Sequence, residues 1–346
     1  MVIKKQKTFS ENKKKTGIKM ENKNRANLTE LKNKVLFGEL LTREELLTLV
    51  DADLTELKEG AREIKEKFLT NTFQLCSIIN TKSGACSEDC KFCAQSSRYS
   101  TGAKIYPLMS AETIKELALS FEKAGITKLS LVTSGRRISK AEVEKMCEIT
   151  RVLKKETRLV VCVSNGLLDY EDFVRLREAG VTYCHNNLET SRRHFSDLCT
   201  THTYDDKIKT IKSAQKAGLI SCTGGIFGIG ETWEDRIDMG LQLRELEVKS
   251  VPMNFLSPIK GTPFENAEAV SEEDKERICA LYRFLLPDAI LRFACGRRDM
   301  KDYGREIFRT SVNACISGDM LTTCGPSTAT DLSIVSSLGY EPEKLQ

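Results

Sequence analysis

The sequence predicts an α/β fold, namely a parallel (βα)8 barrel of the TIM type with an N-terminal helical extension. Short β-rich runs alternate with amphipathic helical patterns eight times, and this order favours a closed parallel barrel over a doubly wound sheet. Several helical patterns end in Ala-Gly, at Gly125, Gly180 and Gly218, where a glycine in the left-handed conformation can end a helix. The 346 residues, 40% hydrophobic and 29% charged, suit a globular protein of this size.

The chain before the barrel is expected to be helical. Apolar residues recur at steps of three and four over residues 27–68, which is the period of an amphipathic helix. Within this stretch, Thr42-Arg-Glu-Glu45 has the spacing of a capping box and marks a helix start. We therefore expect N-terminal helices over residues 26–70 and the barrel over residues 71–346.

The barrel elements follow in order along the chain. The expected strands are β-branched and aromatic runs: Phe73–Asn80, Lys128–Thr133, Leu159–Val163, Thr182–Asn187, Ile220–Phe227, Val251–Leu256, Ala289–Ala294 and Val312–Ile316. The expected helices between them are Ala111–Ala124, Ser139–Lys155, Tyr170–Ala179, Ile208–Ala217, Glu234–Leu246 and Glu272–Leu286. In such a barrel, functional residues lie inside it and at the C-terminal ends of the strands.

Charge and hydropathy exclude several kinds of partner. Residues 1–25 carry eight Lys and one Arg against two Glu, so the rest of the chain has 44 basic and 47 acidic residues. We interpret residues 1–25 as a disordered basic tail, with Met20 as an alternative start, and expect no nucleic-acid partner. The sequence has no run of eighteen apolar residues and no apolar leader, which predicts no membrane partner and a cytoplasmic location.

Thirteen cysteines are the unusual feature of the composition, and three of them form a motif. Cys86, Cys90 and Cys93 have C-x3-C-x2-C spacing in the loop that leaves the first strand. Three thiolates this close together can hold one face of an iron–sulfur cube and leave one iron open. A structural zinc site would need four ligands, and no second Cys pair lies nearby in the sequence.

The cysteine motif resembles the signature of the radical S-adenosylmethionine (SAM) superfamily, in which an aromatic residue, here Phe92, precedes the last Cys. The segment from Gly224 to Glu231 resembles the superfamily's G-x-I-x-G-x-x-E segment, in which Gly228 would let the backbone approach the adenine of SAM. The resemblance implies a [4Fe–4S] cluster whose open iron binds SAM. It also implies cleavage of SAM to a 5′-deoxyadenosyl radical that abstracts hydrogen from an unactivated C–H bond.

From Cys76 onward the sequence is similar to the biotin synthase family, sulfurtransferases that insert sulfur between two saturated carbons of dethiobiotin. The matching segments are Ser83–Tyr99, Asn187–Ser191, Thr200–Tyr204, Val251–Leu256 and Lys260–Pro263. The resemblance implies SAM and dethiobiotin as partners, flavodoxin or ferredoxin as electron donor, and a homodimer. The alternatives are another radical SAM barrel enzyme, of the hydrogenase-maturation or methylornithine-forming type, and a non-enzymatic iron–sulfur or zinc protein.

Four polar residues match cofactor or substrate positions of the family. Asn187 and Glu189 would contact SAM, where a carboxylate can accept both ribose hydroxyl protons. Lys207 replaces the family's usual Arg at the SAM carboxylate, so the charge is kept but the bidentate fork is lost. Asn254 would bind the ureido ring of dethiobiotin.

The family's common type holds an auxiliary [2Fe–2S] cluster with three Cys and one Arg, and the cluster is thought to donate the sulfur. Cys162, Cys222 and Arg292 stand at three of these positions here, with Arg292 counted among the catalytic residues. Ser130 stands at the fourth, and serine binds iron poorly beside a thiolate. One ligand of the common type is therefore missing.

Three further cysteines, Cys295, Cys315 and Cys324, occur where the common pattern has none. We expect a rearranged auxiliary cluster of four irons, as in variant biotin synthases of obligate anaerobes.

One candidate set keeps Cys162 and Cys222 and adds Cys295 or Cys315. The other set, slightly favoured because free Cys is often a small buried hydrophobe, uses all three later cysteines. Strand parity places Cys315 on the face of Asn313, which we take to be inward. Five remaining cysteines are expected to be packing or without a partner: Cys76, Cys147, Cys184, Cys199 and Cys279.

Overall fold

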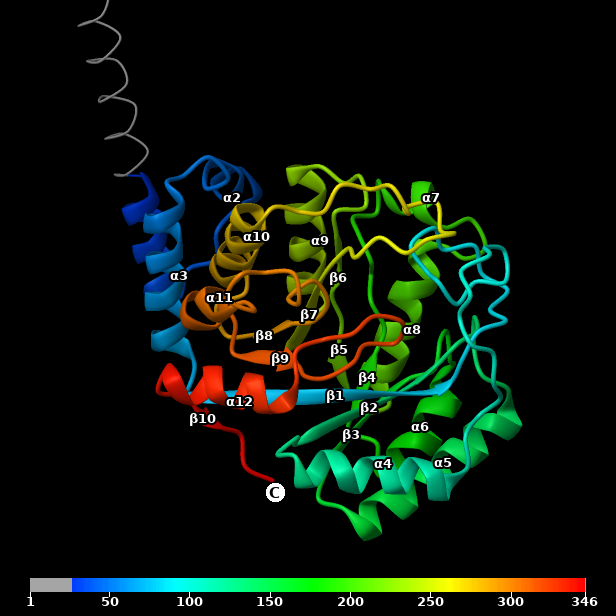
Figure 1. Cartoon of the computed structure of the whole chain (residues 1–346). Coiled ribbons are helices and arrows are strands. Elements are labelled where there is room, and N and C mark those ends of the chain that lie inside the picture. Colours follow the sequence, from blue (N-terminus) through cyan, green and yellow to red (C-terminus); the bar gives the residue numbers. More distant parts are fainter. Residues whose placement is uncertain (1–26, 346) are drawn as a thin grey trace, which may run out of the picture.

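The computed structural model describes residues 27–345 and shows a closed parallel barrel surrounded by helices (Figure 1). The first strand, β1 (Thr72–Lys82), pairs in parallel with both β2 (Lys128–Thr133) and β9 (Ala314–Ile316), and this double pairing closes the ring. The strands between them are β3 (Val160–Ser164), β4 (Tyr183–His185), β5 (Ile220–Cys222), β6 (Gly225–Phe227), β7 (Ser250–Phe255) and β8 (Ile290–Phe293). The predicted barrel is confirmed.

One predicted strand, Ile220–Phe227, is divided into β5 and β6. Both pieces pair with β7, so together they occupy a single strand position in the barrel. The interruption faces Pro252 of β7, which has no N–H to donate to the ladder. The backbones approach closely here, because a Cβ on Gly224 would lie 1.9 Å from the carbonyl oxygen of Pro252.

The N-terminal helices pack against the last third of the barrel. A first helix covers residues 27–36 and is followed by α2 (Arg43–Thr48) and α3 (Leu54–Phe68), of which α2 starts with the expected capping box. Lys58 of α3 lies 2.7 Å from Glu276 of α10 (Glu272–Leu285), and Figure 1 shows the two helices side by side. The expected basic tail lies outside the described residues.

The barrel helices agree with the sequence to within a few residues: α4 (Ala111–Lys123), α5 (Lys140–Glu156), α6 (Tyr170–Glu178), α8 (Tyr204–Lys216), α9 (Trp233–Glu245) and α10. The three glycines expected to end helices do have positive φ, between 83° and 111°. Four short elements were not predicted: α7 (Phe195–Leu198), α11 (Arg305–Thr310), α12 (Thr328–Ser337) and β10 (Glu341–Pro342). They are too short or too rich in Ser and Thr to give a clear apolar period.

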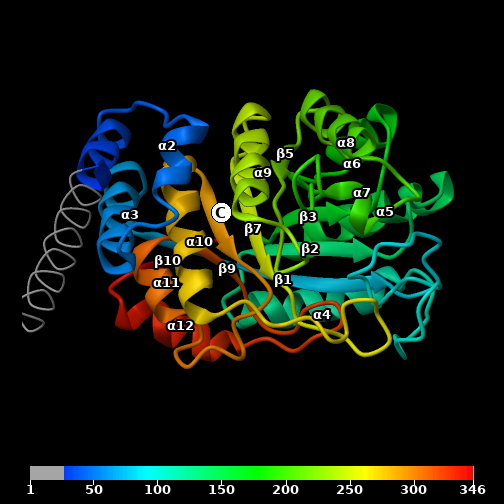
Figure 2. The ribbon, with the colours of Figure 1, turned by 90° about the horizontal axis from the view of Figure 1, so that it is seen from above.

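The loop that carries the cysteine motif leaves the C-terminal end of β1 and lies beyond its arrowhead in Figure 2. This is the end of a parallel barrel at which active sites form. Among the described residues, no helix combines the length and apolarity needed to span a bilayer.

Candidate functional site

The cysteine loop is held in a defined shape by hydrogen bonds of its own backbone. Cys86 donates its N–H to the carbonyl oxygen of Gln95, and the Gln95 side chain accepts from Ser83 and Gly84. Burial raises the pKa of Cys93 to about 11, and the neighbouring Cys86 adds to this effect. Without a metal the Cys93 thiol therefore stays protonated, whereas a bound cation can take the place of its proton. The donor set and its position suit an iron–sulfur cluster.

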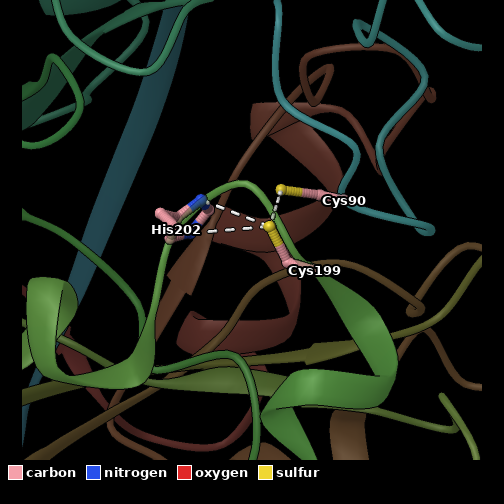
Figure 3. Close-up of side chains that lie close together, drawn as sticks. All are labelled: Cys90, Cys199 and His202. Carbon is pink, nitrogen blue, oxygen red and sulfur yellow. Dashed lines mark hydrogen bonds between the residues drawn. The ribbon is translucent and has the colours of Figure 1, made fainter.

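Cys90, the middle cysteine of the motif, has a thiol neighbour that sequence spacing did not reveal. Its Sγ lies 3.7 Å from Sγ of Cys199, which comes from the loop between α7 and α8 (Figure 3). A hydrogen bond between the two thiols raises the pKa of Cys90, and it lowers that of Cys199 to about 4 against the opposing effect of burial. His202 contacts Glu88 at 2.6 Å and Cys199 at 3.2 Å, in both cases through Nδ1. The two loops are 109 residues apart, so no local motif could indicate the contact.

A central cavity of 220 Å³ connects the cysteine loop with the ends of the later strands. Phe92 and Cys93 line it on the loop side, and Asn254 and Cys295 line it on the opposite side. Asn254, at the end of β7, donates to the carbonyl oxygen of Gly225 at 3.1 Å. Most of the remaining lining is apolar, as in a site for a small organic substrate: Ile78, Ile226, Phe255, Leu256, Ile259, Ile316, Met320 and Leu321.

Glu189 and Lys207 lie together, as the sequence predicted for two residues of one cofactor site. Lys207 Nζ is 3.8 Å from Glu189 Oε1, and both side chains are largely buried. The other carboxylate oxygen of Glu189 is buried and has no hydrogen-bond partner among the described residues 27–345. A buried carboxylate oxygen normally has a partner, so this atom fits a ligand with hydroxyl groups such as a ribose. Glu189 also has a φ of 71°, which is unusual for a residue other than glycine and is common at functional sites.

Contacts within the protein hold the glycine segment from Gly224 to Glu231 in its shape, in addition to any contact with a ligand. A Cβ on Gly225 would lie 2.6 Å from the carbonyl oxygen of Glu189, so the close approach of β6 to the segment after β4 requires glycine. Asn187 belongs to the same contact, since its Oδ1 accepts the N–H of Gly224 at 3.0 Å. The N–H of Gly228 donates to the buried Glu231 carboxylate, so a cofactor would have to approach other atoms of this glycine.

The barrel interior gathers the residues expected from the common auxiliary site. Cys162 and Ser130 are partners across β2 and β3, and Cys222 and Arg292 are buried close enough to Cys162 to interact with it electrostatically. Burial alone would raise the pKa of Cys222, but a hydrogen bond with His185 and the charge of Arg292 lower it to about 6. Arg292 Nη2 donates to Gln74 at 3.0 Å, while its buried Nε has no hydrogen-bond partner in the part of the chain that the structure describes.

Cys76, expected to be a packing residue, belongs to this interior group as well. Its side chain is buried on β1, and after burial and the charge of Cys222 it is a further cause of the raised pKa of Cys162. The alternating pattern of β1 indicates this position of Cys76. Gln74, Cys76 and Ile78 share one face of the strand, and Gln74 and Ile78 both contact the barrel interior. The interior therefore offers three thiols rather than two.

Cys295 and Cys324 meet at a second cavity, of 420 Å³, which we call the mouth cavity. Arg297 and Arg298 also line it, and Cys295 lines the central cavity too. Cys295 Sγ lies 3.5 Å from Ser257 Oγ, and Cys324 is exposed. A group bound between the two cysteines would thus border the central cavity.

The prediction that Cys315 faces the barrel interior is wrong. Cys315 Sγ lies 3.8 Å from Asp331 of α12, in the layer between strand and helix, and it is fully buried there. Asn313, directly before β9, shares a face with Cys315, as strand parity predicts, but that face is the outer one. Asn313 accepts a hydrogen bond from Arg283 of α10, so its polar side chain is satisfied outside the barrel. The structure does not bring Cys315 together with Cys295 and Cys324.

Comparison with protein families matches almost the whole barrel. Residues 81–242 match the Radical SAM superfamily, and residues 252–341 match the Biotin and Thiamin Synthesis associated domain. A biotin synthase from Brachyspira hyodysenteriae is 51% identical over 93% of this chain and 96% of its own length. Biotin synthases from Clostridium botulinum and Akkermansia muciniphila are each 49% identical, over 91% and 90% of this chain and 99% and 97% of their own.

Solved structures of the same fold have much lower sequence identity. Methylornithine synthase superposes with a TM-score of 0.79 at 21% identity, over 91% of this chain and 98% of that one. The [FeFe]-hydrogenase maturase HydG superposes with a TM-score of 0.80 at 16% identity, over 96% of this chain and 79% of that one. At these identities the similarity shows a shared fold and nothing more, and that fold agrees with the barrel described above.

Proposed function

The chain belongs to the biotin synthase family of radical SAM enzymes, and from this we propose that it inserts sulfur into dethiobiotin to form biotin. The observation that carries the proposal is the central cavity, which connects the cysteine loop at Cys93 to Asn254 and Cys295. A substrate bound there would lie between the source of the radical and the strand ends that carry further thiols. The methylornithine and hydrogenase-maturation alternatives share only the fold at 21% and 16% identity.

An anaerobic assay of the reconstituted protein with a reductant and SAM tests this function. We expect 5′-deoxyadenosine formation that rises when dethiobiotin is added, and biotin as the product. SAM cleavage that is indifferent to dethiobiotin would contradict the substrate assignment. A colourless, iron-free protein would contradict the enzyme class as a whole.

Cys86, Cys90 and Cys93 would hold the [4Fe–4S] cluster, which when bound supplies the electron for SAM cleavage. The chain's own contribution is to position SAM and to keep water away. Glu189 offers its unpartnered oxygen to the ribose hydroxyls, and Lys207 offers a positive charge to the SAM carboxylate. Asn254 can donate to and accept from the ureido ring, within apolar walls that suit the carbon chain of dethiobiotin.

Glu189→Gln should weaken SAM binding by roughly 10- to 100-fold, since a hydrogen bond to a charged group contributes about 1.5–3 kcal/mol. Calorimetric titration of the cluster-loaded protein with SAM measures the change. Glu112→Gln on the exposed face of α4 is the matched control and should leave the affinity unchanged. Equal SAM affinity in the parent and in Glu189→Gln would show that this carboxylate does not contact SAM.

We place the auxiliary cluster at the mouth cavity, with Cys295 and Cys324 among its ligands. A cluster there would border the central cavity, which is what sulfur transfer to a substrate in that cavity requires. The competing site is the barrel interior, where Cys76 could replace the thiol lost at Ser130. The orientation of Cys315 toward α12 argues against the three-cysteine set expected from the sequence.

Iron and sulfide analysis of single Cys→Ala variants separates the two sites. Cys295→Ala and Cys324→Ala should lose the auxiliary iron and keep the iron of the cysteine loop, whereas Cys315→Ala should keep both. The interior site would be favoured instead if Cys162→Ala and Cys222→Ala lose the auxiliary iron while the two mouth variants keep it.

Three further assignments follow the family: a cytoplasmic location, a homodimer, and electron transfer from flavodoxin or ferredoxin. The thirteen free cysteines support a reducing compartment. Light scattering on the eluting protein and reduction assays with each donor test the other two.

A further inference from the structure

One cysteine of the loop lies in a group of soft ligands whose other two members are not used by the proposed reaction. Cys90 Sγ, Cys199 Sγ and a ring nitrogen of His202 all lie within 4.8 Å of one another (Figure 3). Two of these three residues, Cys199 and His202, lie outside the C-x3-C-x2-C motif. The geometry points to a mononuclear zinc site in the cluster-free protein, formed by Cys90, Cys199 and His202.

The distances match tetrahedral zinc. Two thiolates about 2.3 Å from a tetrahedral zinc ion lie about 3.8 Å apart, and the observed Sγ–Sγ distance is 3.7 Å. A thiolate and an imidazole nitrogen on the same ion lie about 3.6 Å apart, and Nε2 of His202 lies 4.0 Å from Cys199 Sγ, so a small side-chain shift brings the pair to that distance. Three protein ligands with a water as the fourth form an open zinc site.

His202 is oriented as a metal ligand usually is. Glu88 accepts a hydrogen bond from Nδ1 at 2.6 Å, which leaves Nε2 as the nitrogen with a free lone pair. A carboxylate behind a ligating histidine fixes its tautomer and raises its basicity. The edge of the Phe195 ring packs against the imidazole, with the centroids 5.5 Å apart, and fixes the ring further.

The two loops that carry the ligands are already joined without a metal. Asp89 accepts the backbone N–H of Thr200 at 2.9 Å, and Lys91 donates its N–H to the carbonyl oxygen of Leu198 at 3.0 Å. Little reorganisation is therefore needed for zinc to bind. Cys90 is the only residue that the zinc site shares with the cluster, so the two metal centres exclude each other.

The test uses anaerobic, reduced, cluster-free protein titrated with Co²⁺ or Zn²⁺ against a chromophoric chelator. We expect one Co²⁺ with the visible bands of a tetrahedral thiolate site, and displacement of that ion by zinc. Cys199→Ala and His202→Gln should lose this site. Glu88→Gln should weaken it by roughly 10- to 100-fold. Circular dichroism melting curves establish that each variant is folded.

Cys86→Ala provides the matched control, because it removes a cluster ligand that the zinc site does not use. It should keep the Co²⁺ bands and lose the cysteine-loop cluster, whereas Cys199→Ala should load that cluster and lose the bands. Loss of zinc binding in Cys86→Ala equal to that in Cys199→Ala would overturn the proposal, because the motif itself would then hold the ion. Unchanged zinc binding in Cys199→Ala would overturn it as well. Neither outcome depends on biotin formation, so the proposed function is tested separately.

Discussion

Cys93→Ala should abolish biotin formation and remove the iron of the cysteine-loop cluster. Only three thiolates of the loop are available for this cluster, and a loop that keeps two of them cannot hold a cube with one open iron. Cys93 also lines the central cavity, so the loss occurs at the wall against which the substrate would lie. Product analysis and iron determination on the reconstituted variant measure both effects.

Cys147→Ala is the control for this substitution. Cys147 is a buried residue of α5, packed among apolar side chains away from both cavities. We expect normal iron content and normal biotin formation, with only a small loss of stability. Retention of the full cluster by Cys93→Ala would contradict the assignment of the motif.

Asp331→Ala should lower the free energy of unfolding by about 3–5 kcal/mol, the usual effect of removing one partner from a buried ion pair. Asp331 of α12 pairs with Arg297 through two hydrogen bonds, of 2.8 and 2.9 Å, and neither side chain is exposed. The variant would leave a guanidinium buried without a counter-charge. Denaturant unfolding followed by circular dichroism measures the loss.

Asp288→Ala removes an equivalent charge from an exposed pair with Lys249 and should change stability by less than about 1 kcal/mol. Because Arg297 lines the mouth cavity, Asp331→Ala should also reduce the auxiliary iron if the cluster binds there. An unfolding free energy that is unchanged in Asp331→Ala would mean that the buried pair makes no net contribution.

The parts of the fold that follow from local patterns could be predicted from the sequence. The strands of the barrel and the helices that end at Gly125, Gly180 and Gly218 lie within a few residues of their expected positions. The cysteine loop and the proximity of Glu189 to Lys207 were also predicted, the latter from family resemblance rather than from spacing. Each of these features depends on residues that are close in sequence or on a matched motif.

The features that could not be predicted depend on contacts between distant elements. The interior direction of Cys315 was inferred from strand parity with Asn313 taken to be inward, but Arg283 of α10 donates to that amide in the helix layer, so the shared face points outward. The contact between Cys90 and Cys199 joins two loops that no pattern relates. The split of the fifth strand depends on Pro252, which lies in the neighbouring strand.

The closure of the barrel at β1 has a consequence for synthesis. Because β1 pairs with β9 and β10 as well as with β2, two of its partners are synthesised long after β1 itself. Until then one edge of β1 has no partner, and the nascent chain exposes it to aggregation and to chaperones. The cysteine loop begins where β1 ends, so its final shape is expected only after β9 has been synthesised and has paired with β1. Iron–sulfur assembly would then follow closure of the barrel.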